Sequence, residues 1–446
     1  MPIPANETLK EMDETKINSY HWRIVLTAGM GFFTDAYDLF IIGVVTALLA
    51  PIWHLSTEQF ALLQGASLAA AALGAVFLGT LSDKLGRKKL YGLEVFIMFF
   101  GSIISAVAMN FTWLLIARIV VGFGIGGDYP TSAIVASESA NKSRRGFLVL
   151  LVFAMQALGL VVGPMLASLL LATNLSPEYI WRILLGIGAI PAASVFYLRR
   201  TIQESPRHLL TKSAPLEVSR VVRDLAVDKK KKKNKGYFKK QNLMSRRWLT
   251  CLFGTAGAWF LMDVAFYGNS ISAVTILKAI SPGANLLNHT VISAMIFLIF
   301  AVPGYIVVAK YVDKIGRKPI QYLGFAMMAL CYGLIAMPSV TDNMPLFVLV
   351  FGVSYFFVNF GPNATTFLIP SEVFPSSIRA RAHGISAAIG KAGAFIGAFF
   401  LPIVLKSHGL NFTMGLMAII SALGILTTIF IPEMKNISLD ATEELN

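Results

Sequence analysis

The sequence predicts an all-α membrane protein with twelve transmembrane helices. Two observations carry this prediction: 56% of the 446 residues are hydrophobic and only 14% are charged, and long apolar runs recur twelve times. A water-soluble fold could not cover so much apolar surface. Each run is close to the roughly 20 residues that a helix needs to cross the hydrocarbon core. The runs lie at 22–50, 57–80, 90–109, 112–136, 146–172, 178–198, 248–275, 290–312, 319–338, 344–370, 380–405 and 409–432.

The connectors between these runs alternate in charge. Those after the second, fourth, eighth and tenth runs carry several Lys and Arg, whereas 51–58 and 338–345 carry none. Because short cytoplasmic loops collect basic residues, we expect a multi-pass protein of the cell membrane with both termini in the cytoplasm. No charged segment with a short apolar run and a cleavage site opens the chain, so the first run is expected to be a permanent helix.

The net charge of +14 comes largely from one segment between the sixth and seventh runs. Residues 199–247 hold 16 Lys and Arg against four acidic residues, including five consecutive lysines at 229–233. We interpret this segment as a solvated cytoplasmic linker close to anionic lipid headgroups. Regulatory or nucleic-acid contact is the alternative, and no nucleic-acid partner is expected.

A short motif repeats at corresponding places in the two halves of the chain. Asp83-x-x-Gly86-Arg87-Lys88 follows the second run, and Asp313-x-x-Gly316-Arg317-Lys318 follows the eighth, 230 residues later. A Ser-Glu pair before basic residues also recurs, at 137–138 and 371–372. Two six-helix halves related by a pseudo-two-fold axis would explain both repeats. The expected organisation is a tail at 1–20, bundles at 21–198 and 248–432, the linker at 199–247 between them, and a second tail at 433–446.

Charged residues at the cytoplasmic helix ends are candidates for a gate. A carboxylate at a helix end can accept charge-assisted hydrogen bonds from an Arg of a neighbouring helix, which would close that side until the halves rock apart. For any single residue, a static role in anchoring its loop is an equally good interpretation. The candidates are Asp83, Arg87, Glu138, Arg144, Arg145, Asp313, Arg317, Glu372, Arg379 and Arg381.

The repeated loop also carries a resemblance to a known family. Residues 79–88, GTLSDKLGRK, resemble the Gly-x-Leu-x-Asp-x-x-Gly-Arg-Lys loop of the major facilitator superfamily. The second copy departs from this pattern, because Ala309 stands where the first Gly would be. The resemblance implies the major facilitator fold, with a transport site between two halves.

Four further stretches resemble the phosphate:proton symporter family within that superfamily. They are GFFTDAYD at 31–38, GIGGDYP at 124–130, GTAGAWFLMDVAFY at 254–267, and NFGPN through HGISAAIGK at 359–391. The stretches occur in both halves and in the order of the family. The resemblance implies proton-coupled uptake of inorganic phosphate. We expect no cofactor, and the fold does not need a second copy of the chain to function.

Acidic side chains inside apolar runs indicate a polar pathway. An ionised carboxylate at mid-bilayer costs about 2.5–3.5 kcal/mol, so such residues are found where a polar pathway needs them. Asp35 and Asp38 lie one turn apart, where repulsion between nearby carboxylates would favour keeping a proton on one of them. The resemblance implies proton-handling roles for Asp35 and Asp128, whereas a structural role for Asp38 is an equally good interpretation. Arg118 needs a partner or water.

The seventh run contains a polar stripe, because Trp259, Asp263 and Tyr267 are spaced i, i+4 and i+8 and project from one helix face. An acid between two hydrogen-bonding aromatic residues favours a cavity face over a core. The resemblance implies that this stripe lines a phosphate site. The implied substrate-binding residues are Tyr129, Gln156, Trp259, Asp263, Tyr267, Asn363 and Lys391.

An acid beside an anion is explained by the protonation state of dihydrogen phosphate. This ion has two O–H donors, so an ionised Asp263 can accept a hydrogen bond from one of them, whereas sulfate would meet only repulsion. Lys391 would supply the compensating positive charge. The sequence therefore predicts a small polar site rather than a broad drug-binding cavity.

Alternative functions stay open at this point. A proton-coupled sugar or organic-acid carrier is suggested by Glu204-Ser205-Pro206-Arg207, which resembles a sugar-porter fragment, although the seventh run lacks the paired glutamines of those proteins. A non-transporting nutrient sensor would bind the solute without counterflow. No enzyme is expected, because no Ser/His/Asp set, metal cluster or phosphate-binding Gly-rich loop is evident. Cys251 and Cys331 lack metal-ligand spacing and are expected to be packing residues.

Overall fold

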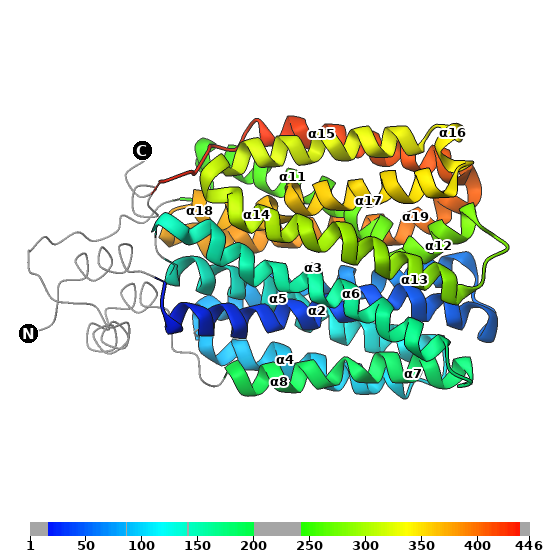
Figure 1. Cartoon of the computed structure of the whole chain (residues 1–446). Coiled ribbons are helices and arrows are strands. Elements are labelled where there is room, and N and C mark those ends of the chain that lie inside the picture. The colour runs from blue at the N-terminus through cyan, green and yellow to red at the C-terminus, as the bar shows by residue number, and fades with distance from the viewer. Residues whose placement is uncertain (1–16, 86, 141, 200–241, 438–446) are drawn as a thin grey trace, which may run out of the picture.

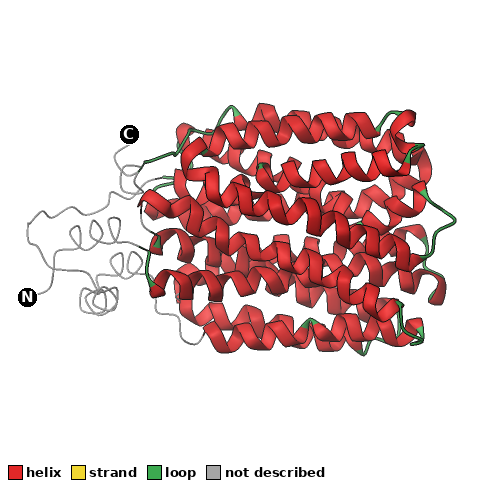
Figure 2. Cartoon of the chain, viewed as in Figure 1, coloured by secondary structure: helices red, strands yellow, loops and turns green. Residues whose placement is uncertain are grey.

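The computed structural model describes residues 17–85, 87–140, 142–199 and 242–437, and every regular element in them is a helix (Figure 1 and Figure 2). Most helices run along one common axis (Figure 1). The predicted all-helical architecture is confirmed for the described chain. The α-helices are α2 (Ser19–Ile52), α3 (Thr57–Leu85), α4 (Arg87–Ala106), α5 (Phe111–Ser139), α6 (Arg145–Leu171), α7 (Pro177–Ile187), α8 (Ala189–Arg199), α11 (Arg246–Ile271), α12 (Ala273–Ile280), α13 (Leu286–Ile296), α14 (Val302–Ile315), α15 (Arg317–Ile335), α16 (Pro338–Thr341), α17 (Met344–Phe360), α18 (Pro362–Val373) and α19 (Ser376–Thr428). A 3₁₀ turn, η1 (Lys142–Arg144), precedes α6, and a π-helical turn, η2 (Phe297–Ala301), joins α13 to α14.

Nine helical segments of the described chain are long and apolar enough to cross a membrane. α4 contributes a shorter apolar stretch, Gly92–Ala106. The outward faces of the helices are apolar as well: Leu73, Ile306 and Ile419 are each more than half exposed. Since helices satisfy their own backbone hydrogen bonds, such faces suit a lipid environment.

Several predicted runs are interrupted at residues that a straight helix does not accommodate well. The sixth run divides at Gly188 into α7 and α8, and the tenth divides at Gly361, which precedes Pro362. The eighth run contains the π-helical turn just before Pro303, whose ring removes a backbone donor. The predicted eleventh and twelfth runs lie on either side of Gly409, whose φ of 78° only glycine adopts readily.

Three predicted boundaries differ by a few residues from the helix ends in the structure. The seventh run was expected to reach residue 275, but α11 ends at Ile271, because the backbone leaves the helical conformation at Ser272 before α12 begins. The linker was expected to include Arg199, but this residue ends α8 and is only 3% exposed. At its other end the expected linker also contained Arg246, which is the first residue of α11.

The amino-terminal helices α2–α8 and the carboxy-terminal helices α11–α19 occupy different sides of the molecule (Figure 1). α2 packs along α6 and α3 along α5, whereas α11 packs along α19. The two sets meet where α3 contacts α19 and where α6 contacts α13 and α14. We call the end where α2, α6, α11 and α15 begin the basic end, on the left in Figure 1, and the opposite end the far end.

Close contact between α3 and α5 depends on two glycines of α5, Gly122 and Gly126. Because they lie one turn apart in the sequence, they are expected to form a smooth helix face that a neighbouring helix can approach. The structure shows α3 in close contact with this face. A Cβ atom at Gly122 would lie 2.1 Å from the carbonyl oxygen of Ser67, and one at Gly126 would lie 2.1 Å from that of Ala71. Larger residues at these positions would force the helices apart.

We expect Gly126→Ala to lower the free energy of unfolding by about 1–3 kcal/mol, because overpacking a tight contact costs that much. Gly283→Ala is the matched control, since nothing lies within 4 Å of the methyl group that it adds. Thermal unfolding of the two purified variants measures the difference. Equal stability of the two variants would contradict the assigned helix contact.

Candidate functional site

A buried group of polar side chains lies between the amino-terminal and carboxy-terminal helices. Lys391 of α19 places its Nζ 2.7 Å from the hydroxyl oxygen of Tyr267 and 3.4 Å from Oδ2 of Asp263, both on α11. Tyr129 of α5 brings its hydroxyl within 3.0 Å of that of Tyr267. These four side chains are each no more than 2% exposed. The contact between Tyr129 and Tyr267 joins the two sets of helices.

The Lys391 ammonium is surrounded by complementary groups. It lies 4.1 Å from the centroid of the Tyr129 ring and 4.1 Å from that of the Tyr267 ring, so both ring faces can stabilise the cation. Asp263 supplies the opposite charge. A buried ion pair is tolerated only when further hydrogen bonds compensate the lost hydration. The arrangement therefore holds one cation and one anion ready to exchange partners with a bound polar solute.

The other predicted substrate ligands are buried as well. Gln156 of α6 is 1% exposed, and neither atom of its amide hydrogen-bonds to a described residue. Asn363 of α18 donates from Nδ2 to the Tyr305 hydroxyl and to Oδ1 of Asn359, at 2.7 Å each. Trp259 is one turn before Asp263 on α11 and is 2% exposed. All seven predicted ligands are thus buried side chains on α5, α6, α11, α18 and α19.

Aromatic rings close this region on the side of Trp259. Phe367 stacks on Phe153 with centroids 4.5 Å apart and meets Phe32 edge-on at 5.1 Å. The ring of Trp259 meets the edge of His383 at 5.5 Å and that of Phe367 at 6.3 Å. Such a shell excludes water and strengthens the electrostatic interactions of the groups inside it.

Sequence reasoning missed two polar residues of this group, Tyr305 and Asn359. Asn359 could have been found, because it lies one helical turn before Asn363 within the NFGPN stretch. Tyr305 had no comparable signal. It is on α14, in an ordinary apolar run, and only the packing of α14 brings its hydroxyl to Asn363.

The predicted proton-coupling acids have different surroundings. Asp38 forms a buried ion pair with Arg118 at 2.6 Å, which supplies the partner that the sequence required for that arginine. Asp128 pairs with Arg199 at 2.6 Å and accepts a hydrogen bond from Ser132. Asp35 is 1% exposed, and neither of its carboxylate oxygens has a hydrogen-bond partner in the described chain.

The spacing of Asp35 and Asp38 along the helix suggested that these two acids mainly affect each other. The structure gives Asp35 other neighbours. Asp128, Arg199 and Glu94 exert electrostatic effects on it. Tertiary packing of α4, α5 and α8 against α2 therefore selects its neighbours. A buried carboxylate without a hydrogen-bond partner is far less costly when it is protonated, so Asp35 suits a neutral, proton-loaded state.

Glu94 is a buried acid that sequence reasoning missed. It lies on α4, is 1% exposed, and neither of its carboxylate oxygens hydrogen-bonds to a described residue. Its side chain lies beside Gly127, where a Cβ would be 3.2 Å from Oε2. Its position inside the third apolar run was the available signal, by the same argument that selected Asp35.

Gate candidates of the carboxy-terminal helices form a connected group at the basic end. The Arg317 guanidinium contacts Glu372 at 2.8 Å and Asp313 at 2.9 Å. Asp313 also accepts hydrogen bonds from the backbone amides of Gly146 and Phe147, at the start of α6. One carboxylate thus joins α14 to an amino-terminal helix and stabilises the positive end of its dipole.

The other described gate candidates have separate contacts. Arg145 donates to the carbonyl oxygen of Ile437 at 3.2 Å, and Arg379 donates to that of Phe374 at 2.9 Å. The guanidinium of Arg144 lies 5.9 Å from the centre of the Phe147 ring, and Arg381 is exposed. The side chains of Asp83, Arg87 and Glu138, and the fragment 204–207, lie outside the described residues.

Glu433, which follows α19, is a further residue of the basic end that the sequence did not single out. Its carboxylate accepts hydrogen bonds from the backbone amides of Arg317 and Lys318 and so caps α15. The cap is possible because Gly316 adopts φ 111° and carries no Cβ, which would lie 2.8 Å from Glu433 Oε2.

The far end is also closed between the two sets of helices. Ser272 donates to Oε1 of Gln64 at 3.4 Å, and Gln64 donates to Thr46 at 3.2 Å. At Gly43 a Cβ would lie 2.1 Å from the carbonyl oxygen of Ile271, so α2 and α11 touch closely there. The central group is therefore enclosed from both ends.

Comparison with known proteins agrees with this architecture. The family described as "Sugar (and other) transporter" matches residues 24–445. The probable inorganic phosphate transporter 1-3 of Arabidopsis thaliana is 37% identical over 97% of this chain and 96% of its own length. The low affinity inorganic phosphate transporter 1 of Petunia hybrida is 36% identical over 99% and 96%.

Solved structures show the same fold. The proton:xylose symporter XylE bound to 6-bromo-6-deoxy-D-glucose superposes with a TM-score of 0.80 at 18% identity, covering 96% of this chain and 99% of that one. The inward open xylose transporter XylE from E. coli gives 0.73 at 19% identity, covering 96% and 100%. The chain is thus a multi-pass membrane transporter with the major facilitator fold. It belongs to the sugar (and other) transporter family, in the branch that contains the inorganic phosphate transporters.

We expect Arg199→Gln to destabilise the protein by about 3–5 kcal/mol, because it leaves Asp128 as a buried charge without its cation. The double variant Asp128→Asn/Arg199→Gln is expected to recover much of this loss. Arg182→Gln, which removes a partly exposed pair with Glu178, is the control and should cost less than about 1 kcal/mol. Thermal unfolding measures all three, and a double variant no more stable than Arg199→Gln would contradict the pairing.

Proposed function

We propose that this protein imports inorganic phosphate together with protons by alternating access. The observation that carries the proposal is the buried Lys391–Asp263 pair with the hydroxyls of Tyr267 and Tyr129, where the two sets of helices meet. A single cation, a single carboxylate and several O–H and N–H groups suit a small anion that also carries protons. The names of the plant relatives support the same substrate.

The proposed architecture has two halves. Twelve spans form two six-helix halves with pseudo-two-fold symmetry, joined by a basic linker between Arg199, which ends α8, and Arg246, which begins α11. The tails at 1–20 and 433–446 and the linker lie in the cytoplasm, and the protein resides in the cell membrane. It is a transporter rather than an enzyme, it acts as a monomer, and it needs no cofactor. The repeated loops, the alternating charge of the connectors and the pairing of helices support this organisation.

Dihydrogen phosphate would bind by exchanging partners with the central ion pair. Lys391 donates to a phosphate oxygen, while the carboxylate of Asp263 accepts a hydrogen bond from a phosphate O–H group. Tyr129, Tyr267 and Trp259 act as further donors. Gln156 supports this role because its buried amide has no partner in the described chain. Asn363 can contribute once it releases Tyr305 or Asn359.

Selectivity against sulfate follows from Asp263. A fully deprotonated oxyanion offers no hydrogen to the carboxylate, so the two negative charges would repel each other in a site without water. Arsenate, which has the same shape and protonation chemistry as phosphate, would not be excluded by this argument.

Protons are proposed to load on Asp35 first. Neither of its carboxylate oxygens has a hydrogen-bond partner in the described chain, whereas Asp38 and Asp128 form ion pairs with arginines. Asp128 joins the pathway when its contact with Arg199 weakens, and Asp38 acts through its pair with Arg118. Neutralising Asp35 lowers the cost of burying it, which permits the halves to rock. Transport with protons also lets the membrane potential, worth about 2.3 kcal/mol per charge per 100 mV, drive an anion inward.

The basic end is proposed to be the cytoplasmic gate. Asp313 holds the start of α6 against α14, and Arg317 with Glu372 keeps Asp313 in place. Opening toward the cytoplasm requires these contacts to break. Asp83, Arg87, Glu138, Arg144, Arg145, Arg379 and Arg381 are proposed to contribute to the same closure.

A sugar or organic-acid carrier is the second candidate, because the matching family is described as one of sugar and other transporters and XylE shares the fold. Uptake of labelled phosphate into proteoliposomes, competed in turn by arsenate, sulfate, organic acids and sugars, decides between them. Competition by arsenate alone supports the phosphate site. Competition by a sugar, or no phosphate uptake, would favour the second candidate.

We expect Lys391→Gln to reduce phosphate uptake at least a hundredfold, since a buried charge-assisted contact contributes about 1.5–3 kcal/mol and the unpaired Asp263 would also repel the anion. Lys310→Gln, at an exposed lysine of α14, serves as the matched control. Initial rates of uptake of radiolabelled phosphate into proteoliposomes measure both. Normal uptake by Lys391→Gln would exclude Lys391 as a substrate ligand.

Asp35→Asn is expected to retain phosphate binding but to lose the acceleration of uptake by an imposed pH gradient, because the amide cannot take up and release a proton. Asp342→Asn, at an exposed acid near the far end, should respond as the wild type does. Uptake rates with and without a pH gradient, and counterflow without one, are the measurements. If Asp35→Asn responds fully to the gradient, Asp35 is not the proton carrier.

A further inference from the structure

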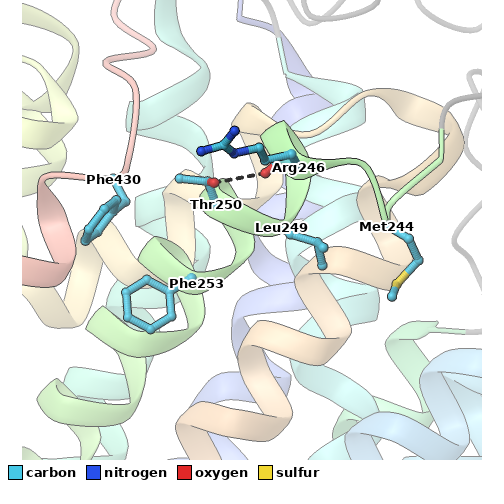
Figure 3. Close-up of a pocket in the computed structure, with 6 residues that line it drawn as sticks. All are labelled: Met244, Arg246, Leu249, Thr250, Phe253 and Phe430. Atoms are coloured by element: carbon cyan, nitrogen blue, oxygen red, sulfur yellow. Dashed lines mark hydrogen bonds between the residues drawn. The ribbon is translucent and has the colours of Figure 1, made fainter.

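A hollow opens on the outer surface of the carboxy-terminal helices at the basic end, away from the proposed transport site. It has a volume of about 520 Å³ and lies between the start of α11 and the end of α19. Figure 3 shows its lining, which comes from five residues at or near the start of α11 and one that follows α19. The residues are Met244, Arg246, Leu249, Thr250, Phe253 and Phe430.

Most of this hollow is apolar and accessible from outside. Met244 is 68% exposed, Phe253 59% and Phe430 45%. The rings of Phe253 and Phe430 meet edge-to-face with centroids 5.4 Å apart, which joins the two helices along one wall. An exposed apolar surface of this kind at the end of a membrane-spanning helix suits acyl chains rather than water.

Arg246 brings a positive charge to the apolar surface. It is exposed, and its guanidinium extends over Thr250 (Figure 3). The guanidinium forms no ion pair or hydrogen bond with a described residue; the backbone carbonyl of Arg246 accepts the hydroxyl of Thr250 at 2.9 Å. Lys318 places a second cation near the hollow. Its Nζ donates to the carbonyl oxygen of Ile429, the residue before Phe430.

We propose that this hollow is a binding site for an anionic glycerophospholipid. The phosphodiester of the headgroup contacts the guanidinium of Arg246, whose planar set of N–H donors matches phosphate oxygens. An acyl chain lies along Leu249, Phe253 and Phe430. Snorkelling of a basic side chain from an apolar helix surface to the headgroup level is the ordinary arrangement at a membrane boundary.

A lipid fits better than free inorganic phosphate, which would leave the apolar wall uncovered. The central site has both a cation and the hydrogen-bonding groups that a small ion needs, whereas this hollow has an aromatic wall. A lipid would contact both parts of the hollow, the apolar wall with its acyl chain and the guanidinium with its headgroup.

A lipid in the hollow would be connected to the proposed transport site through α11. Arg246 is the first residue of that helix, and the same helix carries Trp259, Asp263 and Tyr267 further along. A headgroup held at Arg246, with its acyl chain on Phe430, would tie the start of α11 to the segment that follows α19. The lipid is therefore expected to stabilise the carboxy-terminal helices without touching the substrate.

The full-length protein is tested by native mass spectrometry and thermal unfolding in detergent, with phosphatidylglycerol or phosphatidylcholine added. We expect phosphatidylglycerol to bind and to raise the unfolding temperature more than phosphatidylcholine does. Arg246→Gln should weaken phosphatidylglycerol binding about tenfold, which corresponds to the loss of one charge-assisted contact. Phe253→Ser should weaken the binding of this lipid through the apolar wall.

Arg23→Gln is the matched control, because Arg23 is also exposed and lies near the start of α2 at the basic end. It should keep the preference for phosphatidylglycerol. The proposal is overturned if Arg246→Gln binds both lipids as the wild type does, or if Arg23→Gln loses the preference equally, which would indicate general surface attraction. It is also overturned if inorganic phosphate alone displaces the bound phosphatidylglycerol.

Discussion

The constraint on which the structure depends most is the cost of placing charge inside a membrane-spanning bundle. The pairing of Lys391 with Asp263 lowers this cost, because each provides the opposite charge for the other. The Tyr267 hydroxyl adds a contact to Lys391. The pair sits where α11 and α19 pack against each other and where Tyr129 approaches from the amino-terminal helices. A site held in this way can open only if a solute or proton replaces the partners that are lost.

Among the described residues, the buried acids of the amino-terminal helices are of two kinds, paired and unpaired. Asp38 and Asp128 each have an arginine within 2.6 Å, whereas Asp35 and Glu94 have no hydrogen-bond partner in the described chain. Paired acids can remain ionised, and unpartnered ones are cheaper to bury when protonated. This division separates the charges that hold helices together from those that suit proton transfer. The closures at both ends then keep water away from all of them.

Much of the fold could be predicted from the sequence, because a span is a local property of about 20 apolar residues. The helix interruption at Gly361 and the early end of α11 were missed, since they depend on how each helix meets its neighbours, whereas the break at Gly409 falls between two predicted runs. Of the site, the stripe of Trp259, Asp263 and Tyr267 followed from helical periodicity alone. Tyr305 and Arg199 did not, because their partners, Asn363 and Asp128, are distant from them in sequence.

By itself, the sequence determined that the chain is helical and that it has membrane-spanning segments. It also determined that these segments carry charges whose burial in lipid would be too costly unless they had a function. These conclusions rest on composition, period and transfer energies, which need no knowledge of tertiary contacts. Only the tertiary structure decided which charges are paired: Asp38 with Arg118, Asp128 with Arg199 and Asp263 with Lys391. The physical reason is that Coulomb and hydrogen-bond interactions depend on distances of a few ångströms between helices, and the order of residues along the chain does not contain those distances.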